Sequence, residues 1–191
     1  GANITVAVFR PAPVKSGYFR GPAVYYCSFD NYGRLFRHLL HRLYATGDSI
    51  ALEEVNMYFD NPGKVNTAQT VKLAYKRGRE LGLNEVVVAS TKGDTAYTAL
   101  EIFKDFSITV VTYHCGFREP FKKVMPDEVQ NDIEEKGATV VSATHALSGV
   151  ERSITKKFSG IYPALLIADT LRLFGHGTKV AVEISIMAAD A

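Results

Sequence analysis

The chain has 191 residues and a formal net charge of +2, and 47% of its residues are hydrophobic while 22% are charged. This composition suffices for one folded domain with a hydrophobic core, and no segment approaches the roughly 18 consecutive apolar residues of a membrane helix. No secretory leader is recognisable and the charge is too small to indicate nucleic acid. We therefore expect a cytoplasmic protein that binds neither nucleic acid nor membrane. Cys27 and Cys115 lack a CxxC spacing, so they predict neither a disulfide framework nor a metal site.

Residues 1–52 differ from the rest in charge and in aromatic content. They hold six Arg or Lys side chains against two carboxylates. Proline and glycine residues between Pro11 and Pro22 predict no regular element before about Leu35, where apolar and basic residues at helical spacing predict a short amphipathic helix up to Tyr44. Such a helix would suit an acidic partner or a membrane surface. We interpret residues 1–52 as an extension that packs on the main domain or is partly disordered, and residues 53–191 as the domain itself.

From residue 53 onward, runs rich in Val, Ile and Tyr alternate with helical stretches, which is typical of βαβ units in an α/β fold with a mostly parallel sheet. The expected strands are residues 55–60, 85–90, 108–114, 139–144 and 179–187. The expected helices are residues 67–81, 94–103, 126–136 and 163–174. Near-continuous apolar strands such as residues 86–89 predict helices on both faces of the sheet.

Parallel strands end at one edge of a sheet, where loops lead into helix N-termini whose free N–H groups suit anions. The loop at residues 90–96 combines hydroxyls and a cation with a glycine that permits close approach of the backbone, which together predict a phosphate site. Its candidate residues are Ser90, Thr91, Lys92, Gly93, Asp94 and Thr95. It is not a P-loop, because GxxxxGK[ST] is absent. Alternatively, Thr91 or Asp94 only caps the helix and Gly93 makes the turn, since Asp94 would repel a phosphate.

The loops after the next two expected strands carry further candidates. The third loop supplies His114, Gly116, Phe117 and Arg118, and the fourth supplies His145, Ser148, Gly149 and Arg152 at the start of another helix. His114 and His145 come within reach of each other only if their strands are neighbours. Arg118 and Glu119 form either a clamp for a carboxylate or phosphate, or a solvated pair.

Other chemistries have less support. The three histidines at positions 114, 145 and 176, with Cys115 and Glu183, supply ligand types for zinc, but their spacing does not indicate a site. A nucleophilic role for Cys115 would need a neighbouring base, and adjacent residues of a strand point to opposite faces. Ser148 lies outside the GxSxG pattern of hydrolases.

The polar loops belong to five sequence blocks. These are FDNPGKVNT at 59–67, VVASTKGDTA at 87–96, VTYHCGFRE at 111–119, HALSGVERSI at 145–154 and FGHGTKVAVEISIMAADA at 174–191. In this order they resemble the stand-alone, archaeal-type proteins classed as pyruvate kinase alpha/beta (C-terminal) domain-like. Residues 1–52 show no such resemblance.

The resemblance implies a three-layer α/β/α sandwich similar to the regulatory domain of pyruvate kinase, without the catalytic barrel. Phosphoryl transfer from phosphoenolpyruvate needs a barrel of about 250 residues, so we expect no pyruvate kinase activity. The resemblance implies ligand binding instead, either of a sugar phosphate at residues 90–96 or of flavin mononucleotide (FMN) as a cofactor. Lys92 stands where a hydroxyl is usual in the regulated kinases and Asp94 where a basic residue is frequent, which departs from the sugar-phosphate pattern.

Members of that family continue past the last block with additional strands, so this chain resembles a fragment that is incomplete at its C-terminus. One sheet edge and an apolar surface would then lack their cover, which would allow a homo-oligomer.

Two functions remain open at this point. The first is a non-catalytic domain whose loops hold a phosphorylated small molecule. The second is a small enzyme that uses bound flavin or a phosphorylated metabolite, with His114, His145, Arg118 and Arg152 as acid–base or charge-stabilising groups.

Overall fold

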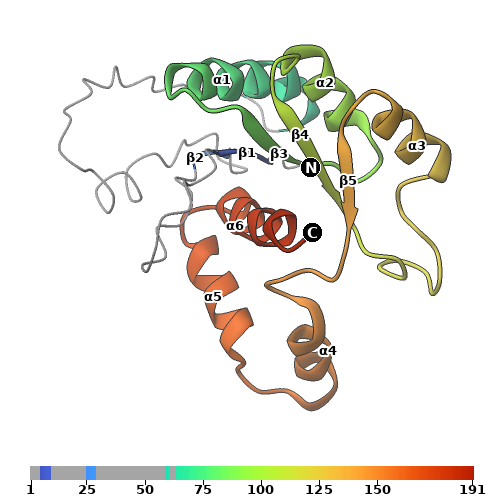
Figure 1. Ribbon diagram of the computed structural model, residues 1–191. Helices are drawn as coiled ribbons and strands as arrows, with labels where there is room; N and C mark the ends of the chain where they lie inside the picture. Colours follow the sequence, from blue (N-terminus) through green and yellow to red (C-terminus); the bar gives the residue numbers. More distant parts are fainter. Residues whose placement is uncertain (1–4, 10–24, 29–58, 61–62) are drawn as a thin grey trace, which may run out of the picture.

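The computed structural model describes residues 5–9, 25–28, 59–60 and 63–191, and its centre is a five-stranded sheet (Figure 1). The strands are β1 (Thr5–Phe9), β2 (Tyr25–Ser28), β3 (Glu85–Ala89), β4 (Ser107–Thr112) and β5 (Thr139–Ser142), in the spatial order β2-β1-β3-β4-β5. β3, β4 and β5 are parallel, whereas β1 is antiparallel to both of its neighbours. The predicted α/β class is confirmed, with β3, β4 and β5 as its parallel part.

One face of the sheet is covered by α1 (Thr67–Glu80), α2 (Asp94–Ile102) and α3 (Asp127–Glu135) (Figure 1). A single turn of 3-10 helix, η1 (Lys64–Asn66), precedes α1. Val86 and Val88 of β3 point to this face, where they join Val110 of β4 and Ile133 of α3 in a buried apolar core. The alternation of side chains along a strand sends Val87 to the opposite face.

The opposite face is covered by α6 (His176–Ala189), with α5 (Pro163–Arg172) packed on α6 and α4 (Gly149–Phe158) next to α5. Ile184 and Met187 of α6 bury their side chains against Val87, Val111 and Val141. Figure 1 shows α4 and α5 extending away from the sheet on this side.

The predicted strand at residues 179–187 is wrong, because these residues lie inside α6. Its sequence, KVAVEISIM, alternates apolar and other residues and is rich in β-branched side chains, so a period of two fits it. Ala181, Ile184 and Met187 are buried at helical spacing, and packing of this stripe on the sheet outweighs the local strand preference.

The predicted strand at residues 55–60 lies mostly outside the described residues, and Phe59 and Asp60 belong to no strand. The prediction that regular structure is absent before Leu35 is wrong at β2, which pairs with β1. β1 in turn pairs with β3 by registers such as Ala7 beside Val87, so two segments of residues 1–52 are part of the sheet. The amphipathic helix expected up to Tyr44 lies outside the described residues, and the division at residue 52 stays a prediction.

The other strands and helices with predicted bounds begin and end within two residues of those bounds. A helix is also predicted at the fourth loop, without stated bounds, and α4 begins there. None of the helices in the described part of the chain combines the length and the apolar character that crossing a bilayer requires.

Candidate functional site

The loops that follow β3, β4 and β5 meet at one edge of the sheet, as the parallel strands require. Backbone and side-chain hydrogen bonds join each loop to the next. Ser90 N donates to Val111 O at 3.0 Å, and Thr112 Oγ1 donates to Thr91 O at 3.2 Å. These bonds connect the loop at residues 90–96 to the end of β4, where the third loop begins. Ser142 Oγ donates to the carbonyl oxygen of Tyr113 at 2.9 Å, which connects the third and fourth. We call this edge the rim.

The loop at residues 90–96 fills its own anion-binding position. The buried hydroxyl of Ser90 accepts hydrogen bonds from Gly93 N at 3.2 Å and from Ala96 N at 3.4 Å. The predicted capping by Thr91 or Asp94 is wrong, because the oxygen that contacts these amides belongs to Ser90. Gly93 has φ +104°, and a Cβ there would lie 2.6 Å from Val129 Cγ1 of α3. The space beside this glycine is therefore filled by the side chain of Val129 and is not open to a ligand.

The charged side chains of this loop also suit a phosphate poorly. Lys92 is exposed, and Thr95 is half-buried in the first turn of α2. Asp94 is in the same turn and forms an ion pair with Lys64 of η1. A carboxylate already occupies the favourable N-terminal end of this helix dipole.

Four rings gather where β4 and β5 end. Tyr113 and Phe117 are stacked, with ring centroids 3.9 Å apart and an interplanar angle of 3°. His145 lies 5.4 Å from each of these two rings, and His114 lies 5.6 Å from His145. The condition that the two histidines need neighbouring strands is met, since β4 and β5 are paired. We call these four residues the aromatic cluster.

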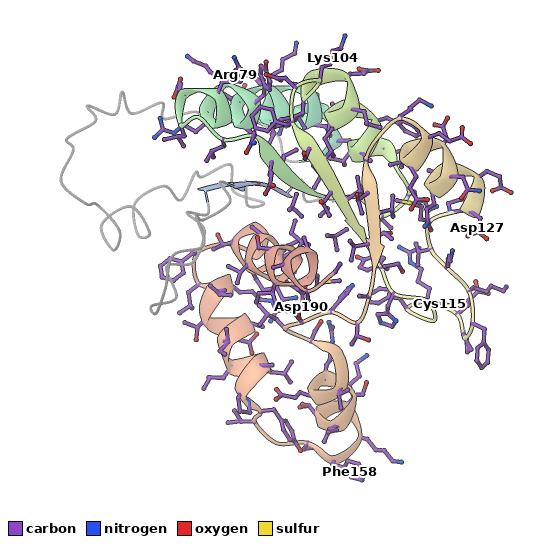
Figure 2. All side chains as sticks on the ribbon, in the orientation of Figure 1. Arg79, Lys104, Cys115, Asp127, Phe158 and Asp190 are labelled. Atoms are coloured by element: carbon purple, nitrogen blue, oxygen red, sulfur yellow. The ribbon has the colours of Figure 1, made fainter. Side chains whose placement is uncertain are left out.

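The third loop, which carries Tyr113, His114 and Phe117 of the aromatic cluster, closes on itself before α3. Gly116 has φ +81°, and its N–H donates to Lys122 O at 2.9 Å, which closes the loop near Cys115 (Figure 2). Arg118 is exposed, and Glu119 pairs with Lys122. Glu119 thus has Lys122 as its ion-pair partner, so the structure supports neither alternative for Arg118 and Glu119 as stated, and Arg118 is exposed.

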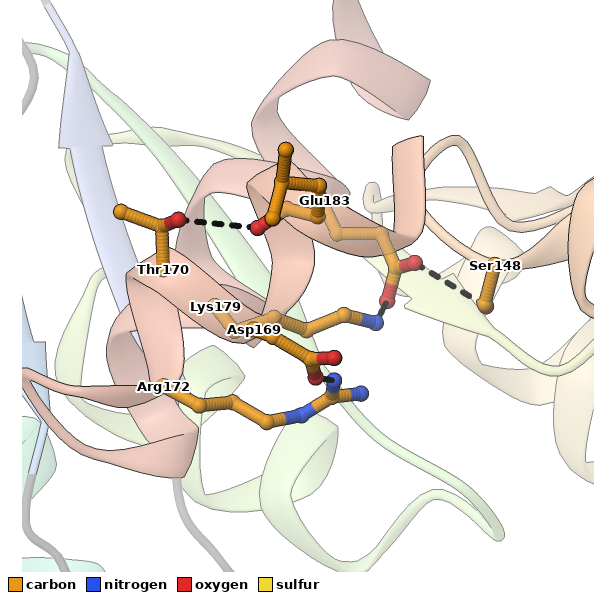
Figure 3. A network of polar contacts seen from close by, with 7 residues as sticks. Ser148, Asp169, Thr170, Arg172, Lys179 and Glu183 are labelled. Atoms are coloured by element: carbon orange, nitrogen blue, oxygen red, sulfur yellow. Dashed lines mark hydrogen bonds and ion pairs between the residues drawn. The ribbon is translucent and has the colours of Figure 1, made fainter. Parts of the chain in front are cut away.

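The fourth loop is anchored from α6. Glu183 Oε1 accepts a hydrogen bond from Leu147 N at 3.1 Å. It also accepts one from Ser148 Oγ at 3.2 Å, and Glu183 Oε2 pairs with Lys179 Nζ (Figure 3). Lys179, Glu183 and Ser148 are each at least 94% buried. Ser148, predicted as a ligand contact, therefore faces Glu183.

The backbone of the first turn of α4 packs closely against Thr144 of the preceding loop. A Cβ at Gly149 would lie 2.4 Å from Thr144 Cγ2, so only glycine fits without movement. Arg152 follows on an exposed part of the same turn.

A groove of about 310 Å³ opens beside this turn. It is lined by Thr144, His145, Ala146, Gly149, Val150, Glu151 and Ala164. Glu151 Oε2 accepts a hydrogen bond from Ala164 N at 2.7 Å and so satisfies one amide at the start of α5. The groove thus joins the aromatic cluster, through His145, to the beginning of α4.

Charges of both signs act on His145, and the groove itself is lined by the carboxylate Glu151. Burial lowers the pKa of His145, Glu183 opposes this shift, and Lys179, His114 and Arg152 reinforce it. Burial also lowers the pKa of Lys179, although its hydrogen bond to Glu183 acts in the opposite direction. The pKa of His176 is lowered by burial and then by Arg172 and Lys179.

Sequence reasoning missed Lys179 and assigned Glu183 only to a hypothetical zinc set. Their separation of four residues would have placed them on one face of a helix, but the segment was expected to be a strand. Among the described residues, no group of three or more His, Cys, Asp or Glu side chains is arranged to hold a metal ion.

No model of a known protein family matches the chain.

Proposed function

We propose that the chain is a small-molecule-binding domain of the pyruvate kinase alpha/beta (C-terminal) domain-like kind, with a three-layer α/β/α sandwich. Helices on both faces of the sheet support the layered arrangement. The five sequence blocks follow one another in the order that the resemblance implies, and four of them fall on the rim or on α6.

The ligand is a phosphorylated small molecule at the rim, bound by the loops after β4 and β5. The observation that carries this proposal is the juxtaposition of the aromatic cluster, the groove and the first turn of α4. A volume of about 310 Å³ is at the lower end of the range for small-molecule pockets. Gly149 N donates to His145 O at 2.9 Å, whereas the side chain of the N-cap residue Ser148 does not cap α4, so the rest of its first turn suits an anionic group. The exposed Arg152 adds a positive charge there.

Both helix starts carry a carboxylate, Glu151 at α4 and Asp94 at α2, and they differ in their other groups. The α4 start also carries the exposed Arg152, and its Glu151 is engaged with Ala164 N at 2.7 Å. At the other loop, Ser90 satisfies the helix amides and Asp94 is negative. We therefore assign the phosphate to the α4 end and give Lys92 a minor role.

The aromatic cluster fits a planar ring. Tyr113 and Phe117 are stacked on each other, and the partly exposed Phe117 offers an edge or face to a further ring. FMN combines such a ring with a phosphate, whereas a sugar phosphate would use the cationic groups alone. Both stay candidates, and the flavin, when bound, would supply redox chemistry.

Flavin fluorescence provides the test. FMN is titrated with protein, with riboflavin as the matched ligand that lacks the phosphate and fructose 1,6-bisphosphate as a competitor. We expect Arg152→Ala to weaken FMN binding about tenfold, the size of one charge-assisted hydrogen bond, and to leave riboflavin binding unchanged.

Lys92→Ala is the matched control, and its affinity for FMN should stay close to that of the wild type. A larger loss from Lys92→Ala than from Arg152→Ala would move the phosphate to the loop at residues 90–96. If neither FMN nor the sugar phosphate binds the wild type at millimolar concentration, the proposed function is wrong.

A second candidate is a small enzyme, favoured by one observation. His114 and His145 lie side by side with ring centroids 5.6 Å apart, and burial lowers the pKa of His145, which suits a general base at neutral pH. Arg118 and Arg152 would then stabilise developing charge. If the protein is such an enzyme, it should convert a phosphorylated metabolite into a detectable product. His145→Gln should then abolish turnover and leave the affinity for that metabolite unchanged.

A further inference from the structure

The buried pair Lys179–Glu183 lies on α6 and does not line the groove. The side chains of Lys179 and Glu183 are only 5% and 6% exposed, and such a pair costs desolvation energy that an apolar pair of similar size would not. Stability alone therefore does not account for this pair. The contacts of Glu183 indicate what else the pair does.

We propose that Lys179 and Glu183 are positioning residues for the ligand site: the Glu183 carboxylate, oriented by Lys179, fixes the loop that carries His145 and the first turn of α4. This inference rests on the proposed function, since it concerns the control of the same site. By this proposal the geometry of the groove depends on α6, although no residue of α6 is among those that line it.

Three contacts hold the carboxylate in one orientation. Oε1 receives both Leu147 N and Ser148 Oγ, and Oε2 receives Lys179 Nζ, so neither oxygen can turn without breaking a hydrogen bond. Leu147 and Ser148 stand between His145 and Gly149, where α4 begins. A displacement of the carboxylate would move the imidazole and the helix start together.

The charges that face His145 come from three other elements. Glu183 and Lys179 are on α6, Arg152 is on α4, and His114 follows β4. Lys179 in turn faces Arg172 of α5 and Arg152 of α4. Removing the carboxylate should therefore lower the pKa of His145 further, whereas removing the ammonium should raise it.

The test uses the complete chain without ligand. The His145 ring is followed by NMR titration in the wild type and in the variants Glu183→Gln and Lys179→Met, with Glu128→Gln, an exposed carboxylate of α3, as the control. We expect the His145 midpoint to shift to lower pH in Glu183→Gln and to higher pH in Lys179→Met. Opposite signs are a signature that general destabilisation cannot produce.

The double variant Lys179→Met/Glu183→Leu keeps the experiment decisive if a single variant fails to fold, because replacing both partners with apolar residues is often neutral for stability. In this folded variant, hydrogen exchange at Leu147 N should accelerate about tenfold relative to the amides of β4, since its acceptor is gone. Unchanged protection of Leu147 would overturn the proposal.

FMN affinity separates this inference from the proposed function. If the wild type binds FMN, the double variant should bind it about tenfold more weakly, and equal affinity would overturn the positioning role. If the wild type binds no FMN or sugar phosphate, the proposed function is wrong, and the titration and exchange results alone decide whether α6 positions the loop.

Discussion

The two faces of the sheet are built on different principles. On the side of α1, α2 and α3, the core is apolar and closed, and it includes the completely buried Phe103 and Ile133. On the side of α4, α5 and α6, a smaller apolar cluster borders on a buried ion pair, and α4 has no buried residue at all. The first face stabilises the fold, and the second carries the polar groups from which a site can be made.

The closed face owes part of its stability to aromatic packing. Phe103 lies edge-to-face against Tyr75 at 5.4 Å and against Phe106 at 4.9 Å. Such pairs contribute about 0.5–1.5 kcal/mol each beyond the area they bury. They connect α1 to the end of α2 and to the turn before β4.

The other face leaves large apolar side chains exposed on α4 and α5 and in the segments that follow them. They are Val150, Phe158, Ile161, Leu166, Ile167 and Leu173. Where such side chains lie next to one another, they usually mark an interaction site. The expected association into a homo-oligomer stays a prediction, and this surface is where it would occur.

The largest effect should come from the closed face. Phe103→Ala should lower the free energy of unfolding by about 3–5 kcal/mol, because it removes a completely buried ring and leaves a cavity. Urea denaturation followed by circular dichroism measures this.

The matched change on the other face is Leu166→Ser, at a side chain that is 59% exposed. Stability should change by only about 0.5 kcal/mol, and self-association in sedimentation velocity should decrease if this surface mediates it. Equal losses of stability in Phe103→Ala and Leu166→Ser would contradict the contrast between the faces.

An intermediate effect is expected at Gly93. Alanine there combines an unfavourable positive φ with a clash against Val129, whereas alanine at Gly82, also at positive φ, meets no atom within 4 Å. We expect Gly82→Ala to cost about 1–2 kcal/mol and Gly93→Ala about 1–3 kcal/mol more, because the packing between α2 and α3 is already filled. Similar melting temperatures for the two variants would show that Val129 yields without cost.

The smallest expected effect is a pH dependence of the free energy of unfolding, which arises from two histidines on the side of α4, α5 and α6. The pKa values of His145 and His176 are lowered by burial from the ordinary value of 6.5, so the unfolded chain binds protons that the folded protein does not. The free energy of unfolding should be highest above pH 6.5 and decrease as the pH falls through that value towards the lowered pKa values.

Denaturation at pH 7.5 and pH 5.5 measures this difference, and the variant His145→Gln/His176→Gln should show less of it. If the double variant loses as much stability on acidification as the wild type, the two imidazoles are not its source.

Sequence patterns predicted most of the closed face and the position of the rim. The apolar runs of β3 and β4 and the breaks at Gly82 and Gly137 define their elements locally, and parallel strands bring the loops to one edge. Local patterns could not predict that the Ser90 hydroxyl would accept hydrogen bonds from the amides of its own loop, because this depends on the turn at Gly93.

The interpretation of α6 failed for a related reason. A period of two in KVAVEISIM is a local signal, whereas burial of Ile184 and Met187 against three strands is a tertiary one. The bond from Ser148 to Glu183 spans 35 residues, and a sequence read with residues 179–187 as a strand gives no indication of it.

The dependence of the rim on Glu183 has a consequence for biosynthesis. The strands, the closed core and the helix α4 are all encoded before α6. While a ribosome is still translating residues 176–189, the nascent polypeptide can complete the α1–α3 side but has no acceptor for Leu147 N. The hydrogen bond from Leu147 N to Glu183, and with it the fixed geometry of the fourth loop, can therefore form only after α6 has been made.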